Sequence, residues 1–227
     1  MPLPSRTALQ VRRTATEMLT LVRLHLQQDQ PGAISDMDYF RRSDRVIKTL
    51  VEEYEPLAQY LYSIDSSATL AGCLTSPGAP ADAEIWDGDR LRESIQIVHG
   101  TSNYSEALKR ESLCCGEIVF ANSEYRRSEA SRTPVEGPSQ MSPGGLAEDT
   151  AASIIQAIEK KVAKKYSGID TLIVVYDETM STTVTNSNQV ITNSIDAWIG
   201  TKTSLDVAPF TKIVIVSNNG HTRSWKI

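Results

Sequence analysis

The sequence is poor in the residues that build disulfide frameworks and structural zinc sites. It has only three cysteines and three histidines in 227 residues. Cys114 and Cys115 are neighbours, Cys73 is distant, and no C-x-x-C pair occurs. Adjacent cysteines rarely form a disulfide with each other, because the bridge strains the peptide between them. We therefore expect free thiols, a reducing compartment such as the cytoplasm, and no structural zinc site.

Long hydrophobic runs and an excess of one charge are also missing. No apolar stretch reaches the roughly 20 residues that a membrane-spanning helix needs, and the polar N-terminus lacks the apolar core of a signal peptide. We therefore expect no membrane partner. The net charge is −5, and a mildly acidic chain is not built for tight, non-specific binding of nucleic acid, although a local basic patch remains compatible with it.

The familiar catalytic motifs are absent. The sequence has no P-loop, no G-x-G-x-x-G, no G-x-S-x-G and no H-E-x-x-H. Cys114 or Cys115 would have the chemistry of a nucleophile, with His99 or His221 as its base. Buried structural cysteines are much the commoner case, so the sequence does not favour cysteine catalysis.

What the sequence does contain is a clear helix-to-strand pattern between Ala151 and Glu178. The run Thr171 to Tyr176 is apolar and rich in β-branched residues, which predicts a strand covered on both faces. The preceding segment predicts an amphipathic helix, because apolar residues recur at every fourth position. These apolar positions are Ile154, Ile158, Val162 and Tyr166.

Two groups of charged residues near this pattern are candidate binding residues. Lys160, Lys161 and Lys164 lie on the polar side of the predicted helix, near its end. Such lysines usually serve solvation and complement the helix dipole, and phosphate binding is the functional alternative. Asp177 and Glu178 directly follow the predicted strand, where open α/β sheets gather ligands and where ordinary turns also use acidic residues.

The first part of the chain, residues 1–62, is predicted to be helical. One helix is expected from about Thr7 to residue 30, and a second from Asp36 or Ser43 to Tyr62. Pro56 interrupts the second pattern, which predicts a kink or a fresh start there. Two helices joined by a short turn indicate an αα-hairpin. Because the first helix lies outside the central pattern, it is also a candidate surface for a homodimer.

Residues 83–227 are predicted to form the sheet, after an irregular connector over residues 63–83. Asp87-Gly88 between two strand-like runs, Ala83–Trp86 and Arg90–Val98, is a strong hairpin signal. The loop over residues 123–145 is expected to be exposed and mobile. Further elements are expected at Tyr104–Cys115 (helix), Glu117–Phe120 (strand), Gln189–Ile199 (helix), Phe210–Ser217 (strand) and Trp225–Ile227 (edge strand).

Together these elements predict one domain, residues 1–227, of mixed α/β class. The hairpin supplies an antiparallel part of the sheet, and the C-terminal strand–helix–strand unit supplies a parallel part. Helices flank the sheet, and the N-terminal helices pack at one side. The length and an apolar content of 40% are ordinary for a globular protein with a sizeable core.

The order of the predicted elements resembles that of the restriction-endonuclease-like nucleases of the PD-(D/E)XK type. This order is a helix, a β-hairpin, a helix and a two-stranded parallel unit. The resemblance implies a Mg²⁺ held by acidic residues of the hairpin, for which the candidates are Asp82, Asp87, Asp89 and Glu93. Carboxylates suit this role, because magnesium prefers hard oxygen ligands. The family's acid-x-lysine step is absent here, since Ile95 stands two residues after Glu93.

Two functions are therefore open at the level of sequence. One is a non-catalytic or degenerate module that binds a protein or a nucleic acid, which the missing catalytic set, the lysines and the long polar loop favour. The alternative is a divergent metal-dependent nuclease that uses the acidic residues of the hairpin. Bound manganese among these carboxylates would favour the nuclease.

Overall fold

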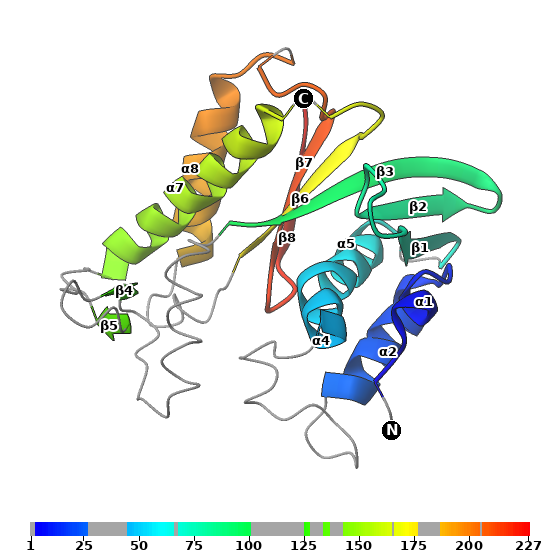
Figure 1. The fold of residues 1–227 in the computed structure, drawn as a ribbon. Coiled ribbons are helices and arrows are strands. Elements are labelled where there is room, and N and C mark those ends of the chain that lie inside the picture. Colours follow the sequence, from blue (N-terminus) through cyan, green and yellow to red (C-terminus); the bar gives the residue numbers. More distant parts are fainter. Residues whose placement is uncertain are drawn as a thin grey trace.

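A computed structural model describes residues 3–26, 45–65, 68–100, 125–127, 134–136, 143–164, 166–176, 187–204 and 206–227. The described chain is of mixed α/β class, with a six-stranded sheet and helices packed against it (Figure 1). The strand order is β1-β2-β3-β6-β7-β8. These strands are β1 (Leu70–Leu74), β2 (Ala83–Asp87), β3 (Arg90–His99), β6 (Thr171–Tyr176), β7 (Lys212–Ser217) and β8 (Thr222–Lys226).

The sheet is antiparallel at its two margins and parallel in its centre. β1, β2 and β3 form an antiparallel meander, β3, β6 and β7 run parallel, and β8 returns antiparallel to β7. Leu172 of β6 pairs with Ile213 of β7. Every residue of β6 is buried, as expected for a central parallel strand with helices over both faces.

Two helical layers cover the sheet (Figure 1). On one face, α7 (Pro143–Val162) and α8 (Ser187–Gly200) enclose the apolar cluster that contains Ile154, Leu172 and Ile195. The other face packs against α2 (Ala15–Leu26) and a helix made of α4 (Arg45–Thr49), η1 (Leu50–Tyr54) and α5 (Glu55–Ile64).

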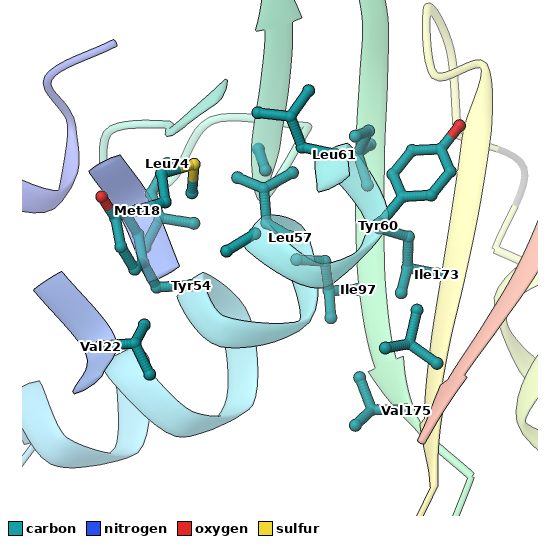
Figure 2. Close-up of a cluster of buried hydrophobic side chains, with 14 of the residues drawn as sticks. Met18, Val22, Tyr54, Leu57, Tyr60, Leu61, Leu74, Ile97, Ile173 and Val175 are labelled. Atoms are coloured by element: carbon teal, nitrogen blue, oxygen red, sulfur yellow. The ribbon is translucent and has the colours of Figure 1, made fainter. Parts of the chain in front are cut away.

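The second cluster lies between this longer helix, α2 and the sheet. Figure 2 shows Leu57 of α5 close to Ile97 of β3, and Met18 of α2 beside Tyr54 at the end of η1. Met18, Tyr54 and Leu57 are fully buried. Since neighbouring residues of β6 alternate between the two clusters, the central strands connect both layers.

The helix over residues 45–64 contains one turn of π-helix, η1, between two α-helical segments. The N–H of Glu55 donates to the carbonyl of Leu50, five residues earlier. The sequence places an irregularity at Pro56, and the structure puts it one turn before. Pro56 itself is the second residue of α5, inside this continuous helix, where its ring removes one backbone donor directly after the π turn. Single π turns of this kind are frequent at functional sites.

The prediction of one N-terminal helix is wrong. The chain forms α1 (Arg6–Leu9) and α2, separated at Thr14. The Thr14 hydroxyl accepts from the N–H of Glu17 at 3.4 Å, and the Glu17 carboxylate accepts from the N–H of Thr14 at 2.8 Å. This reciprocal pair is a capping box that starts a new helix at Ala15.

Three further predictions need correction or lie outside the described residues. The predicted irregular connector over residues 63–83 contains β1. The predicted loop over residues 123–145 contains the two-stranded ribbon of β4 (Tyr125–Arg127) and β5 (Pro134–Glu136), and α7 already begins at Pro143. Tyr104–Cys115 and Glu117–Phe120 lie outside the described residues.

The hairpin, both central strands, α8 and the last edge strand are confirmed. No helix in the described part of the chain is long and apolar enough to cross a bilayer. Cys73 is buried and not in a disulfide.

Candidate functional site

Asp82 occupies the point where β2 begins and β3 continues past it. Its backbone N–H donates to the carbonyl of Ile95 at 2.8 Å, and its carboxylate Oδ2 accepts from the N–H of Ile97 at 2.8 Å. If β2 began earlier in the chain, a backbone carbonyl would accept the Ile97 N–H. The Asp82 carboxylate accepts it instead. This fixes one side of a half-buried acid beside the part of β3 that extends past the start of β2.

Glu53 of η1 approaches Asp82 from one helical layer. Burial raises the pKa of Glu53 above its ordinary value, and the charge of Asp82 raises it further. Burial also raises the pKa of Asp82, against the opposing effects of the Ile97 hydrogen bond and of the positive charges of Lys161 and Arg6. Glu53 is thus a half-buried carboxylate whose charge the neighbouring Asp82 disfavours, an arrangement that a bound cation would stabilise.

Lys161 of α7 approaches Asp82 from the other layer. Its Nζ donates to Oε1 of Gln96 at 2.8 Å, and the Gln96 amide in turn donates to the carbonyl of Pro80, two residues before Asp82. Gln96 is 4% exposed. The buried amide therefore holds the lysine beside the start of β2, and the site combines groups from η1, β2, β3 and α7.

A second acid of η1 extends the site along β3. The Glu52 carboxylate lies 4.0 Å from Nε2 of His99, the last residue of β3, and 3.9 Å from Nζ of Lys48. The wider turn of η1 thus carries two consecutive acids that both reach the sheet side of the helix.

The structure separates the four acids that the resemblance grouped. Asp82 lies in the site. Asp87 and Asp89 are exposed at the tip of the β2–β3 hairpin, and five extended residues place Asp87 roughly 17 Å from Asp82 along the strand. Asp89 is 3.9 Å from Nη1 of Arg12. These two residues are not brought together with Asp82.

Glu93 lies in a closed, buried network on the face covered by α5. Its carboxylate accepts from Nζ of Lys212 at 2.6 Å, from the Tyr60 hydroxyl at 2.8 Å and from the Thr171 hydroxyl at 2.9 Å. Burial raises the pKa of Tyr60, and the adjacent carboxylate adds to the effect. The lone pairs of Glu93 are used within the protein, which is typical of a structural ion pair.

The predicted binding residues also divide. Of the lysines, Lys161 enters the site, whereas Lys160 is exposed on α7 and Lys164 is exposed in the turn after it. Asp177 and Glu178 lie outside the described residues.

Glu53 and Gln96 were not among the residues predicted from the sequence. A signal for Glu53 was available, because it lies three residues after Leu50 on the apolar stripe of the predicted helix. Acidic residues are rare on such a buried face unless they have a partner or a function. Gln96 carries no comparable local signal.

The residues present fit magnesium better than zinc or calcium. Among the described residues, no three His, Cys, Asp or Glu side chains gather as a metal site. Magnesium commonly keeps several waters and uses only one or two protein carboxylates together with substrate phosphates, whereas calcium needs six to eight oxygen ligands. Asp82 and Glu53 supply two carboxylates, which is the number that magnesium commonly takes from a protein.

Comparisons of the chain with family models, with curated proteins and with solved structures find no match.

Proposed function

We propose that this chain is a divergent, metal-dependent nuclease of restriction-endonuclease-like fold, with its site at Asp82. The observation that carries the proposal is that two carboxylates and a lysine, from η1, the start of β2 and α7, gather beside the second half of β3. The β-hairpin followed by a parallel strand unit, which the resemblance implies, supports it.

In this proposal Asp82 and Glu53 hold a Mg²⁺ ion. When bound, Mg²⁺ supplies Lewis-acid polarisation of a phosphoryl oxygen and lowers the pKa of a bound water. The Ile97 N–H fixes the orientation of the Asp82 carboxylate. Lys161 places a positive charge where a phosphate would lie and has protons to donate to the attacked group.

Lys161 also accounts for the missing lysine of the hairpin. Ile95 stands at the position of the acid-x-lysine step, and its side chain is fully buried in the core below α5. An ammonium group from α7, held by Gln96 at 2.8 Å, supplies the charge from the opposite layer instead.

The second candidate is a module that binds nucleic acid without cleaving it. Gln96 favours this candidate, because a neutral amide occupies the β3 position closest to the site, where a further carboxylate would strengthen cation binding. The homodimer and the cytoplasmic location stay predictions.

The test combines metal binding with cleavage. Labelled single-stranded DNA, duplex DNA and RNA are incubated with the full chain in Mg²⁺ or Mn²⁺, and Tb³⁺ luminescence reports the cation site. We expect cleavage of at least one substrate, with a loss of about 100-fold or more in Asp82→Asn and in Glu53→Gln. Asp89→Asn is the matched control, since it removes an exposed carboxylate at the hairpin tip and should leave cleavage unchanged.

The outcomes separate the candidates. Cation binding that depends on Asp82, together with nucleic-acid binding but no cleavage, would replace the nuclease by the binding module. If neither cation nor nucleic acid binds in an Asp82-dependent way, both candidates are wrong.

A further inference from the structure

The two edges of the sheet differ in how they are covered. β1 forms one edge, and the N-terminal segment pairs with the outer side of this strand. The N–H of Arg13 donates to the carbonyl of Gly72 at 3.0 Å, and the N–H of Gly72 donates to the carbonyl of Arg13 at 2.8 Å. β8 forms the other edge, and no described residue pairs with its outer side. An edge strand left open in this way is a template for a further strand.

The ladder between β7 and β8 fixes which backbone groups point outward. At its two ends, the carbonyl of His221 accepts from the N–H of Ser217 at 2.9 Å, and the N–H of Ile227 donates to the carbonyl of Thr211 at 3.0 Å. The register between these ends is continuous, so every second residue of β8 likewise turns its N–H and carbonyl toward β7. The N–H and carbonyl groups of the remaining residues point away from the sheet. These residues are Thr222, Ser224 and Lys226.

Two side chains on the α8 face of β8 are held in place beside each other. Nε1 of Trp225 donates to Oδ1 of Asp196 in α8, and Nη2 of Arg223 lies 3.6 Å from Oδ2 of the same carboxylate. The Arg223 guanidinium lies 5.8 Å from the centroid of the Trp225 ring. Arg223 is exposed and Trp225 is half-buried. The open edge therefore carries a cation and an aromatic ring two residues apart.

We propose that β8 pairs antiparallel with β8 of a second copy of this chain, about a two-fold axis that passes beside Ser224. In this register Thr222 faces Lys226 of the second copy, and Ser224 faces its own equivalent. The outward groups of these residues form about six main-chain hydrogen bonds between the two copies. The sheet then continues through both copies, with α8 of each copy on the same face.

Charge complementarity favours this register and this partner. Arg223 lies opposite Trp225 of the second copy, and the symmetry repeats the contact, so that two cation–π pairs form at once. Charged residues on an edge strand oppose pairing when like charges face each other. Here Lys226 faces the neutral Thr222 instead. A shift by two residues in one direction would place the two Arg223 side chains opposite each other, and a shift in the other direction would leave Thr222 without a partner.

Sedimentation of the full chain over a range of concentrations tests the proposal. We expect a monomer–dimer equilibrium with a dissociation constant on the order of micromolar, because a short edge strand buries less area than most stable interfaces. Ser224→Pro removes the central outward N–H and should weaken the dimer about tenfold or more, while edge strands tolerate proline. Ser224→Ala keeps this N–H and is the matched control, which should leave the dimer unchanged.

A charge swap tests the register with substitutions that keep every backbone donor. Thr222→Lys places two lysines opposite each other at both ends of the ladder and should weaken the dimer about tenfold. Adding Lys226→Glu to this variant turns the repulsion into attraction and should restore the dissociation constant of the wild type. Lys226→Glu alone should stay close to the wild type. The melting temperature of each variant shows whether it folds.

A chain that stays monomeric at every concentration would overturn the proposal. So would a dimer that neither Ser224→Pro nor Thr222→Lys weakens. Loss of the dimer in Leu24→Glu, at an exposed position of α2, would place the contact on that helix instead. A weakening by Thr222→Lys that Lys226→Glu does not reverse would exclude this register. These measurements involve no cation and no nucleic acid, so their outcome is independent of the proposed function.

Discussion

At the scale of single residues, burial of Asp82 disfavours the charged carboxylate that the proposed function requires. A raised pKa means that the folded protein binds the Asp82 proton more tightly than the unfolded chain does. The carboxyl therefore contributes stability below its unfolded pKa, and this contribution is lost as the pH rises through the folded value. Burial raises the pKa, and the groups that oppose this are the Ile97 N–H, Lys161 and Arg6.

Asp82→Asn should accordingly raise the melting temperature at about pH 7, and the gain should shrink as the pH falls and vanish below about pH 3, where the carboxyl is protonated in both states. Thermal unfolding followed by circular dichroism measures it. Asp89→Asn, at a fully exposed carboxylate, should show no gain at either pH. A lower melting temperature of Asp82→Asn at neutral pH would mean that its charge is better compensated than the geometry indicates.

The ion pair of Glu93 and Lys212 gives a second prediction. Lys212→Met leaves the buried carboxylate with two hydroxyl donors and no opposite charge, so we expect a loss of about 3 kcal/mol in the free energy of unfolding. The double variant Glu93→Leu/Lys212→Met should lose less than the sum of the two single variants. Urea denaturation measures all three. Lys226→Met, at an exposed position of β8, is the control, and additive losses would show that the two charges act independently.

Glu93 also shows what the sequence could and could not predict about the site. Alternation along β3 correctly places Glu93 on the face of Ile95 and Ile97, which the structure covers with α5. Its partner Lys212 is 119 residues away in the chain, and no local pattern connects the two. The same holds for Lys161 and Gln96, which are 65 residues apart.

At the scale of elements, Gly100 controls how closely α7 approaches the end of β3. A Cβ at this position would lie 2.7 Å from Cγ1 of Ile154 and 3.2 Å from the Ile154 Cα. Gly100→Ala should therefore destabilise the protein by about 1 to 3 kcal/mol, because the backbone of α7 has to move. Gly200→Ala at the end of α8 meets nothing within 4 Å, and should be neutral in the same urea titration. A neutral Gly100→Ala would show that α7 shifts freely.

The elements that the sequence predicted well are those with long or doubly apolar patterns, namely α7, α8, β6 and β7. β1 was missed because it is short and contains Gly72, which weakens any strand pattern. The structure supplies the reason for this glycine, since a Cβ there would lie 3.2 Å from Cδ2 of Leu61 and from Sδ of Met18. The requirement comes from the packing of two distant helices, which a local pattern does not contain.

At the scale of the whole molecule, the two apolar clusters share the central strands and should unfold together. Leu57→Ala removes a fully buried side chain below α5, and Ile195→Ala removes one below α8. Each should cost about 2 to 5 kcal/mol and lower the same single transition. Tryptophan fluorescence and far-ultraviolet circular dichroism should give coincident curves. A variant that shifts one of two separate transitions would show that the layers fold independently.

The π-helical turn η1 bears on how this chain can change in length. A π turn holds one residue more than an α turn, so losing one residue within Leu50–Tyr54 would turn the segment into a plain α-helix. After such a deletion, Leu57 and Tyr60 could keep their packing on the sheet while the helix before η1 rotates. Alternatively, the helix before η1 could keep its packing while Leu57 and Tyr60 rotate away. In either case Glu52 and Glu53 would no longer point toward His99 and Asp82. Descendants of the same ancestor that keep the site should therefore keep this extra residue, and a shortened helix would mark the lineages that have abandoned it.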